Sequence, residues 1–290
     1  MKLKYFATLA LIACLAQATE IDSQIATING HQLHYYKIGT SGSPLILLTG
    51  YATTSNFWNT RFVECLAQQH QVYLFDYAGI NTPYQQIESR SIQTMASDVN
   101  QLSIQLGLSN PSLIGWSMGG GVALQASFDA QERYTHLYLL APIVPFQNGS
   151  FSSAGKTHQP FKTSNNVLNY VFNNNLSNYN QASLSTLQAQ LIQPQVTDLF
   201  PAKNIIIQQE QAISSWISNP TSTQSFQHTQ VPATFYIPDQ DQIIQQNYLK
   251  GVIASYPNST VVRVSGSGHA VAWQYPIEIC NNITADMQSN

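Results

Sequence analysis

Short apolar runs bounded by turn residues alternate along the chain with segments of helical periodicity. Continuous apolar runs suit strands that are covered on both faces, as in a parallel sheet. Apolar residues at helical spacing predict helices over 91–108 and 118–130. The predicted strands cover residues 45–49, 72–75, 112–114, 137–140, 234–237 and 261–264. This alternation predicts an α/β fold with a doubly wound, mostly parallel sheet.

The pattern breaks between residues 146 and 228. This stretch is rich in Asn, Gln and Ser, carries scattered aromatic residues and contains few charges. It is too long for an ordinary loop, so we expect it to form short helices of its own. Because the strand and helix pattern resumes afterwards, we interpret 146–228 as a cap insertion in a core made of residues 19–145 and 229–290.

Composition indicates a protein with a large core and little surface charge. Hydrophobic residues make up 43% of the 290 residues and charged residues only 9%. Eleven Lys and Arg against fourteen Asp and Glu give a formal net charge of −3. Such a chain offers no cationic surface for a phosphate backbone, which argues against a nucleic-acid partner. Nothing in the sequence implies a stable protein partner.

The first eighteen residues have the three zones of a secretory signal peptide. Two lysines come first, an apolar run covers 5–15, and Ala16-Gln17-Ala18 forms a small-x-small cleavage site. The apolar run is too short to span a bilayer comfortably. We therefore expect cleavage before Thr19 and export to the periplasm or the medium.

The three cysteines leave two questions open. Residues 11–14 resemble the lipobox of bacterial lipoproteins, in which Cys14 would be acylated and tether the protein to a membrane. We favour simple cleavage, because the apolar region before Cys14 is short for a lipoprotein leader. Without Cys14, the pair Cys65 and Cys280 remains, either bridged in an oxidising compartment or as two buried thiols.

A nucleophile motif follows the strand predicted over residues 112–114. Gly115-Trp116-Ser117-Met118-Gly119 is G-x-S-x-G between a strand and a helix, the context that this motif requires. A sharp turn at Ser117 needs neighbours without side chains so that the helix can cross the strand closely. Gly115 and Gly119 meet that need and favour a nucleophilic Ser117 over an idle serine in a glycine-rich turn.

A serine nucleophile needs a base, and His269 is the best candidate. It follows Gly266-Ser267-Gly268, directly after the strand predicted over 261–264. Surface or structural roles suffice for the other histidines, which are His31, His34, His70, His136, His158 and His228. A histidine among glycines at a strand end favours a functional role over a plain turn.

The acid that orients the base is sought after the strand at 234–237, where Asp239 and Asp241 are both available. Here the chain resembles the α/β-hydrolase fold family, whose members carry a proline-led strand with an Asp nine residues after the proline. Counted from Pro232, the resemblance implies Asp241, in the family's order Ser117, Asp241, His269. Pro238 replaces a usual glycine of that turn, so Asp239 remains the alternative.

The resemblance covers the chain from about His31 to its end, apart from the insertion. Residues 47–51, Leu-Leu-Thr-Gly-Tyr, resemble the family's strand that ends in His-Gly, with Thr49 in place of His. By carry-over, the backbone N–H groups of Tyr51 and Met118 form the oxyanion hole. Residues 76–79 resemble the family's Asp-x-Arg/Pro-Gly turn, with Asp76 structural and Ala78 a departure.

The resemblance also bears on the thiols. The first and last helices of the family's fold cover the same face of the sheet, and Cys65 and Cys280 fall on those helices. The resemblance therefore implies a disulfide between Cys65 and Cys280.

Together these residues predict acyl transfer to water on a small acyl ester, as in a carboxylesterase or lipase, without cofactor or metal. Amidase, thioesterase and carbon–carbon hydrolase chemistry use the same machinery. A serine at position 117 argues against epoxide and haloalkane hydrolases of the same fold, which use Asp there. Aromatic residues of the insertion, more simply read as core, are candidates to line an acyl pocket: Phe146, Phe151, Phe161, Tyr170, Phe172, Phe200 and Trp216.

A catalytically silent hydrolase scaffold that serves as a binding protein is the competing interpretation, since fold alone does not imply activity. The complete set of Ser117, Asp241 and His269 favours the enzyme.

Overall fold

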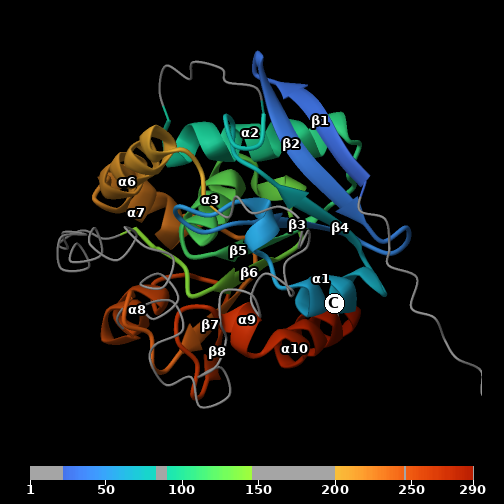
Figure 1. Cartoon of the computed structure of the whole chain (residues 1–290). Coiled ribbons are helices and arrows are strands. Elements are labelled where there is room, and N and C mark those ends of the chain that lie inside the picture. Colours follow the sequence, from blue (N-terminus) through green and yellow to red (C-terminus); the bar gives the residue numbers. More distant parts are fainter. Residues whose placement is uncertain (1–21, 83–89, 146–199, 245, 290) are drawn as a thin grey trace, which may run out of the picture.

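The structure, a computed structural model, describes residues 22–82, 90–145, 200–244 and 246–289. One sheet of eight strands runs through it in the order β1-β2-β4-β3-β5-β6-β7-β8 (Figure 1). The strands are β1 (Asp22–Ile28), β2 (His31–Ile38), β3 (Pro44–Leu48), β4 (Gln71–Phe75), β5 (Ser112–Trp116), β6 (Leu137–Leu140), β7 (Ala233–Pro238) and β8 (Ser259–Val264). Only β2 runs against its neighbours, so the predicted mostly parallel α/β sheet is confirmed.

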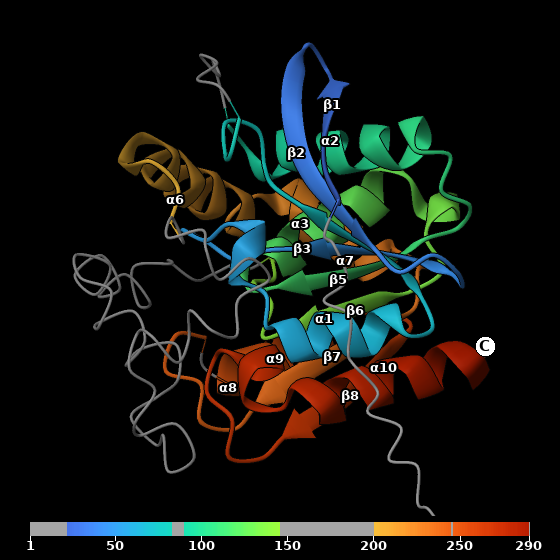
Figure 2. The same ribbon diagram turned by 45° about the vertical axis from the view of Figure 1, so that its right-hand side comes forward.

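Helices cover both faces of the sheet (Figure 2). One face carries α2 (Ile92–Gln105), α3 (Met118–Asp129), α6 (Lys203–Ile217), α7 (Pro220–His228) and α8 (Gln246–Ile253). The other face carries α1 (Thr60–Ala67), the short α9 (Val271–Gln274) and α10 (Pro276–Ser289). Two one-turn 3₁₀ helices, η1 (Ser55–Phe57) and η2 (Gln131–Arg133), lie in the connections.

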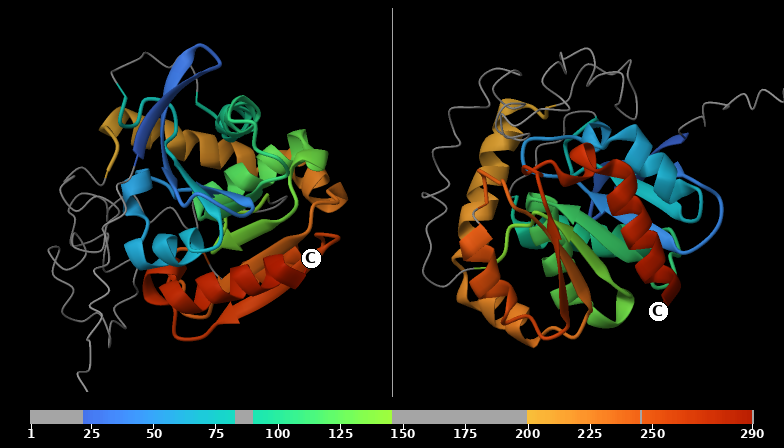
Figure 3. Two further views of the ribbon diagram at one scale, coloured as in Figure 1. Left: turned by 90° about the vertical axis from the view of Figure 1, so that its right-hand side faces the viewer. Right: turned by 90° about the horizontal axis from the view of Figure 1, so that it is seen from below.

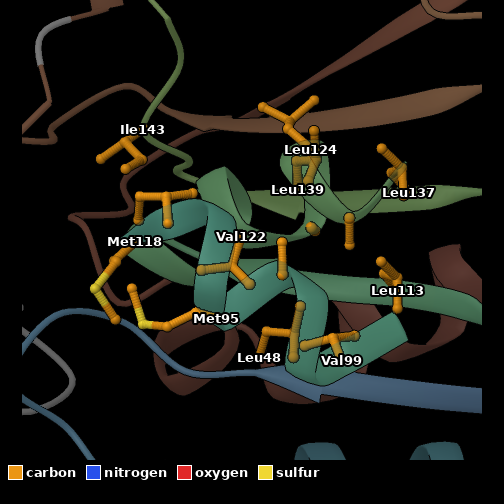
Figure 4. Close-up of a cluster of buried hydrophobic side chains, with 14 of the residues drawn as sticks. Leu48, Met95, Val99, Leu113, Met118, Val122, Leu124, Leu137, Leu139 and Ile143 are labelled. Atoms are coloured by element: carbon orange, nitrogen blue, oxygen red, sulfur yellow. The ribbon is translucent and has the colours of Figure 1, made fainter. Parts of the chain in front are cut away.

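The larger hydrophobic core lies between the sheet and α2 and α3 (Figure 4). Leu48, Leu113 and Leu139 from three parallel strands pack there with Met95 and Val122 from the two helices (Figure 4). Every residue of β5 is buried. This burial on both faces explains why the parallel strands have continuous apolar sequences instead of alternating ones.

Within residues 146–228, helices α6 and α7 are described. Residues 146–199 lie outside the described residues, and with them Phe146, Phe151, Phe161, Tyr170 and Phe172. Helices α6 and α7 lie on the same side of the sheet as α2 and α3 (Figure 3). Trp216 of α6 is 1% exposed, and its indole N–H donates to Gln125 Oε1 of α3 at 2.8 Å.

The second core joins the first and last helices of the chain. Helices α1 and α10 lie side by side on the face opposite α2 (Figures 1 and 2). A disulfide connects Cys65 of α1 to Cys280 of α10, with 215 residues of sequence separation. The pairing implied by the family resemblance is confirmed. The helices of the described residues include none that is both long and apolar enough to cross a bilayer.

Candidate active site

The turn between β5 and α3 holds Ser117 in an unusual backbone conformation. Its φ of 56° and ψ of −116° lie in a region that a residue with a side chain rarely adopts. Ser117 lies between the carboxyl end of β5 and the first residue of α3, and its burial is high, at 7% exposed. A strained residue at a strand-to-helix turn is what a nucleophile elbow requires.

The two flanking glycines permit this turn because there is no room for a side chain at either. A Cβ atom on Gly115 would lie 2.5 Å from the carbonyl oxygen of Gly119. A Cβ atom on Gly119 would lie 2.1 Å from the carbonyl oxygen of Leu48, on the neighbouring strand β3. Helix α3 therefore crosses the sheet at a distance that only glycine tolerates. The sequence pattern predicted this close crossing of helix and strand.

His269 lies on the loop after β8, next to the elbow. The indole N–H of Trp116, the residue before Ser117, donates to the backbone carbonyl of His269 at 2.8 Å. The rings of Trp116 and His269 are 5.6 Å apart between centroids. The His269 side chain is 3% exposed, so its imidazole is held in a position shielded from bulk water.

Asp241, which follows β7, contacts His269 directly. Its Oδ2 lies 2.8 Å from His269 Nδ1, and its side chain is fully buried. The other oxygen, Oδ1, accepts the backbone N–H groups of Ile243 at 2.8 Å and Ile244 at 3.0 Å. The carboxylate is therefore fixed by its own turn and hydrogen-bonded to the imidazole, the arrangement in which an acid orients a base.

Asp239, the alternative acid, has a different place. Its carboxylate accepts the Ser265 hydroxyl at 3.0 Å and the Gly266 backbone N–H at 2.7 Å. It thus holds the start of the loop that carries His269 and does not contact the imidazole. The register of Asp241, counted from Pro232, agrees with the contact to His269.

The loop after β3 approaches the elbow from the other side. A Cβ atom on Gly50 would lie 3.3 Å from Ser117 Cβ. The Tyr77 hydroxyl donates to the Thr49 carbonyl at 3.1 Å, and the Thr53 hydroxyl donates to the Gly50 carbonyl at 2.8 Å. These bonds fix the segment that carries the backbone N–H group of Tyr51.

The two expected oxyanion donors have suitable surroundings. Met118 is the first residue of α3, where backbone N–H groups lack acceptors within the helix and the helix dipole favours negative charge. Tyr51 is half-buried, and burial together with the nearby Glu210 carboxylate raises the pKa of its phenol to about 12. The Tyr51 side chain is therefore neutral in the physiological range.

Asp76 has the structural role that the sequence suggested. It is fully buried, and its carboxylate accepts the Ser55 backbone N–H at 2.6 Å, the Ser55 hydroxyl at 2.8 Å and the Asn81 amide at 2.7 Å. The guanidinium of Arg90 donates to the carbonyl of Ala78 at 2.5 Å. These contacts hold the loop after β4 beside the segment that follows β3.

A second chain of Ser, His and Asp exists in the described residues. His34 Nε2 lies 2.6 Å from the Ser23 hydroxyl, and His34 Nδ1 lies 3.2 Å from Asp76 Oδ2. Ser23, however, lies within the regular ladder of β1, with no elbow and no helix N-terminus beside it. The chain Ser23–His34–Asp76 therefore lacks the donors that would stabilise an oxyanion, and Ser23 makes a useful control serine.

The other histidines that the structure describes have structural surroundings. His31 Nε2 lies 3.0 Å from an oxygen of Asp98, and His136 Nε2 lies 2.9 Å from the Thr234 hydroxyl. His158 lies outside the described residues.

Sequence reasoning missed Trp116 and Gln274, and it did not foresee the role of Asp239. Trp116 holds the His269 loop, Asp239 holds its beginning, and Gln274 Oε1 accepts the Gly268 backbone N–H at 2.7 Å. Trp116 lies inside the nucleophile motif, which was the one available signal. The contacts of Asp239 and Gln274 depend on how distant turns meet.

Comparison with known proteins supports the fold described above. The sequence profile of the α/β hydrolase fold family matches residues 43–276. A curated relative, a soluble epoxide hydrolase from Corynebacterium sp., is 33% identical over 123 residues, which are 42% of this chain and 42% of that protein. The chain thus spans about two-fifths of the length of the curated relatives it matches.

Solved structures are similar over nearly the whole chain. An alpha/beta hydrolase fold protein from Chitinophaga pinensis has a TM-score of 0.79 at 17% identity, covering 94% of this chain and 99% of that one. An esterase from Exiguobacterium antarcticum has a TM-score of 0.74 at 19% identity, covering 91% and 98%. At these identities the likeness shows the fold alone. The profile match over most of the sequence, together with this fold, shows that the chain belongs to the α/β hydrolase fold family.

Proposed function

We propose that this protein is a serine hydrolase that cleaves small acyl esters through an acyl-enzyme, with Ser117 as nucleophile. His269 is the general base, Asp241 orients it, and the backbone N–H groups of Tyr51 and Met118 form the oxyanion hole. The observation that carries the proposal is the buried hydrogen bond of 2.8 Å between Asp241 and His269, next to the strained turn at Ser117.

The first half-reaction forms the acyl-enzyme. The Ser117 oxygen attacks the ester carbonyl while its proton passes to His269 Nε2, and the carbonyl oxygen becomes an oxyanion. Asp241 accepts from Nδ1–H and stabilises the imidazolium. As the tetrahedral intermediate collapses, the bond to the alcohol breaks and His269 protonates the leaving oxygen.

The second half-reaction returns the enzyme to its starting state. Water attacks the acyl carbon, and His269 takes one of its protons. The bond to the Ser117 oxygen then breaks, the proton returns to that oxygen, and a carboxylic acid leaves. No redox step or additional reactant is needed.

Two observations favour an ester over an epoxide or a halide, the kinds of substrate that the names of some relatives indicate. The nucleophile position carries Ser117, an alcohol that forms an ester intermediate, whose hydrolysis by water His269 can assist. The elbow has aromatic neighbours: Phe57 stacks on Trp116 at 5.3 Å between ring centroids. A neutral ester with a short to medium acyl chain suits such a site, in line with the esterases among the solved structures of similar fold.

A fluorophosphonate probe tests the proposal, because it reacts covalently with activated serines. We expect one adduct, on Ser117, and hydrolysis of p-nitrophenyl esters by the same preparation. Ser117→Ala should abolish the adduct and lower kcat by at least about 10³-fold. Asp241→Asn should lower kcat by up to about 10⁴-fold with the protein still folded.

Ser23→Ala is the matched control, since it removes a serine that also contacts a histidine but lies in a regular strand. It should leave labelling and hydrolysis unchanged. A wild-type protein that neither takes the probe nor cleaves any ester, amide or thioester of a graded panel would contradict the proposal and leave a silent scaffold.

A further inference from the structure

Gln209 of α6 contacts the loop after β3, the loop that carries the backbone N–H group of Tyr51. Its side chain is completely buried, and its Oε1 accepts the backbone N–H of Ala52 at 2.9 Å. The two residues are 157 positions apart in the sequence. An N–H group donates, so the atom of Gln209 that receives it must be the amide oxygen.

The loop that Gln209 contacts has a strained conformation. Ala52 has φ of 56°, in the left-handed region that residues with a side chain rarely occupy. Such a conformation persists only when the surroundings hold it. In the described residues, Gln209 supplies the hydrogen bond to the backbone N–H of Ala52 itself.

Two hydrogen bonds flank Tyr51, one on each adjoining peptide plane. The carbonyl of Gly50 and the N–H of Tyr51 belong to the same plane, and the Thr53 hydroxyl holds that carbonyl at 2.8 Å. The N–H of Ala52 belongs to the next plane, which Gln209 holds. With both planes fixed, the direction of the Tyr51 N–H group is fixed as well.

Gln209 Nε2 is buried and has no hydrogen-bond acceptor among the residues that the structure describes. A buried donor without an acceptor lowers stability. An apolar side chain of the same length would remove this cost, although it would leave the Ala52 N–H without its acceptor. The two changes in stability oppose each other, so a substitution by an apolar residue of the same length tests the geometry of the loop without a large expected loss of stability.

We propose that Gln209 is a positioning residue for catalysis, which holds the Tyr51–Ala52 peptide so that the Tyr51 N–H points at the developing oxyanion. This inference rests on the proposed function. An amide suits this role better than a carboxylate. A carboxylate at position 209 would accept from Ala52 equally well, but would add a fully buried negative charge to that of the half-buried Glu210, which already lies near Tyr51.

Three variants test the role of Gln209. Gln209→Met keeps the length and removes the acceptor. Gln209→Glu keeps the acceptor and adds a titratable group. Gln211→Met makes the same substitution at an exposed position of the same helix and serves as control. Each is measured for kcat and KM on a p-nitrophenyl ester, for its rate of fluorophosphonate labelling, and for thermal stability.

We expect Gln209→Met to lower kcat and the labelling rate by about tenfold or more, with KM changed less than twofold and the melting temperature close to wild type. Removal of a complete oxyanion donor lowers kcat by about 10²–10³-fold, and this is the largest loss that we expect for Gln209→Met. Gln211→Met should match the wild type. For Gln209→Glu, the ratio of its kcat to that of the wild type should fall as the pH rises and the new carboxyl ionises.

Several results would overturn this role. The first is a Gln209→Met protein with wild-type kcat. The second is a Gln209→Met protein whose loss of kcat is explained by a lower melting temperature. The third is a ratio of Gln209→Glu kcat to wild-type kcat that does not change with pH. If Gln209→Met does not fold, the pH dependence of Gln209→Glu decides alone. The two proposals fail differently: an unreactive wild type removes both, whereas a reactive wild type with unaffected Gln209 variants removes only this one.

Discussion

At the scale of single residues, the site depends on where side chains are missing. Ser117 adopts φ of 56° because α3 turns back sharply over β5. That turn is open only because Gly115 and Gly119 have no Cβ atoms to meet the backbone of neighbouring segments. The position of Ser117 thus requires glycine at both of these flanking positions.

Gly119→Ala should damage both fold and site. The added Cβ would lie 2.1 Å from the Leu48 carbonyl oxygen, so the helix must move away from the sheet. Overpacking of this kind costs about 1–3 kcal/mol of unfolding free energy, and the shifted elbow should slow fluorophosphonate labelling. Chemical denaturation and labelling kinetics measure the two effects.

Gly251→Ala is the control for that substitution, because in the described part of the chain nothing lies within 4 Å of a Cβ atom at Gly251 of α8. It should leave labelling unchanged and keep or slightly raise stability, since alanine is favoured over glycine in a helix by up to about 1 kcal/mol. Equal effects of both alanines would show that crowding at the elbow is not the cause.

The burial of His70 predicts that the protein loses stability in acid. The residue is 5% exposed, and burial lowers the pKa of its imidazole, an effect that the Ser43 backbone only partly offsets. In the unfolded chain the pKa of a histidine is about 6.5. Below that pH, His70 therefore binds a proton in the unfolded chain but stays neutral in the folded protein until its lowered pKa is reached. Stability should fall as the pH decreases from that value toward the lowered pKa of the folded state.

Denaturation midpoints of wild type and His70→Leu between pH 7.5 and 5 measure this effect. The variant should lose less stability over the range than the wild type. His228→Leu, at an exposed position, is the control and should keep the wild-type slope. If His70→Leu shows the wild-type slope, His70 does not carry the acid sensitivity.

At the scale of elements, the helices that close the sheet are joined in pairs. Helix α1 packs on α10 and is tied to it by the disulfide, while α6 packs on α2 and α7 packs on α3. The hairpin of β1 and β2 extends the sheet at one edge through a two-residue turn, Asn29-Gly30, with φ of 48° and 83°. Asn-Gly is the preferred sequence for such turns, a signal that was present in the sequence although the strand list omitted this hairpin.

Removal of the disulfide should destabilise the protein without unfolding the site. Because the bridge closes a loop of 215 residues, its loss should lower the free energy of unfolding by about 2–5 kcal/mol. Denaturation curves with and without reductant measure this. The double variant Cys65→Ser with Cys280→Ser should match the reduced wild type and show no response to reductant; equal stability of all forms would contradict a stabilising role.

At the scale of the whole molecule, the sheet gathers residues that are far apart in the sequence. Ser117, Asp241 and His269 follow β5, β7 and β8, three parallel strands whose carboxyl ends lie at one edge. Ligands of open α/β sheets bind at this edge. Insertion of α6 before β7 then brings Gln209 to the loop after β3, at the same edge.

We propose further that the molecule is exported, and the processing of residues 1–18 tests this. A signal peptide cleaved after Ala18 leaves a mature chain that begins at Thr19 and carries the Cys65–Cys280 bridge. Intact-mass spectrometry of the protein from the extracytoplasmic fraction should give that mass, and Cys14→Ser should not change it. An acylated chain beginning at Cys14 would show a lipoprotein instead.

The sequence by itself determined the alternation of strands and helices after residue 45, the mostly parallel sheet and the elbow, because each depends on local patterns of apolar residues and glycines; the choice of Asp241 over Asp239 came from the family resemblance. Only the tertiary structure decided which carboxylate meets His269, that Trp116 holds the histidine loop, and that Gln209 supports the loop after β3. These contacts join side chains across many strands, and their distances depend on how whole layers pack, which no local pattern encodes.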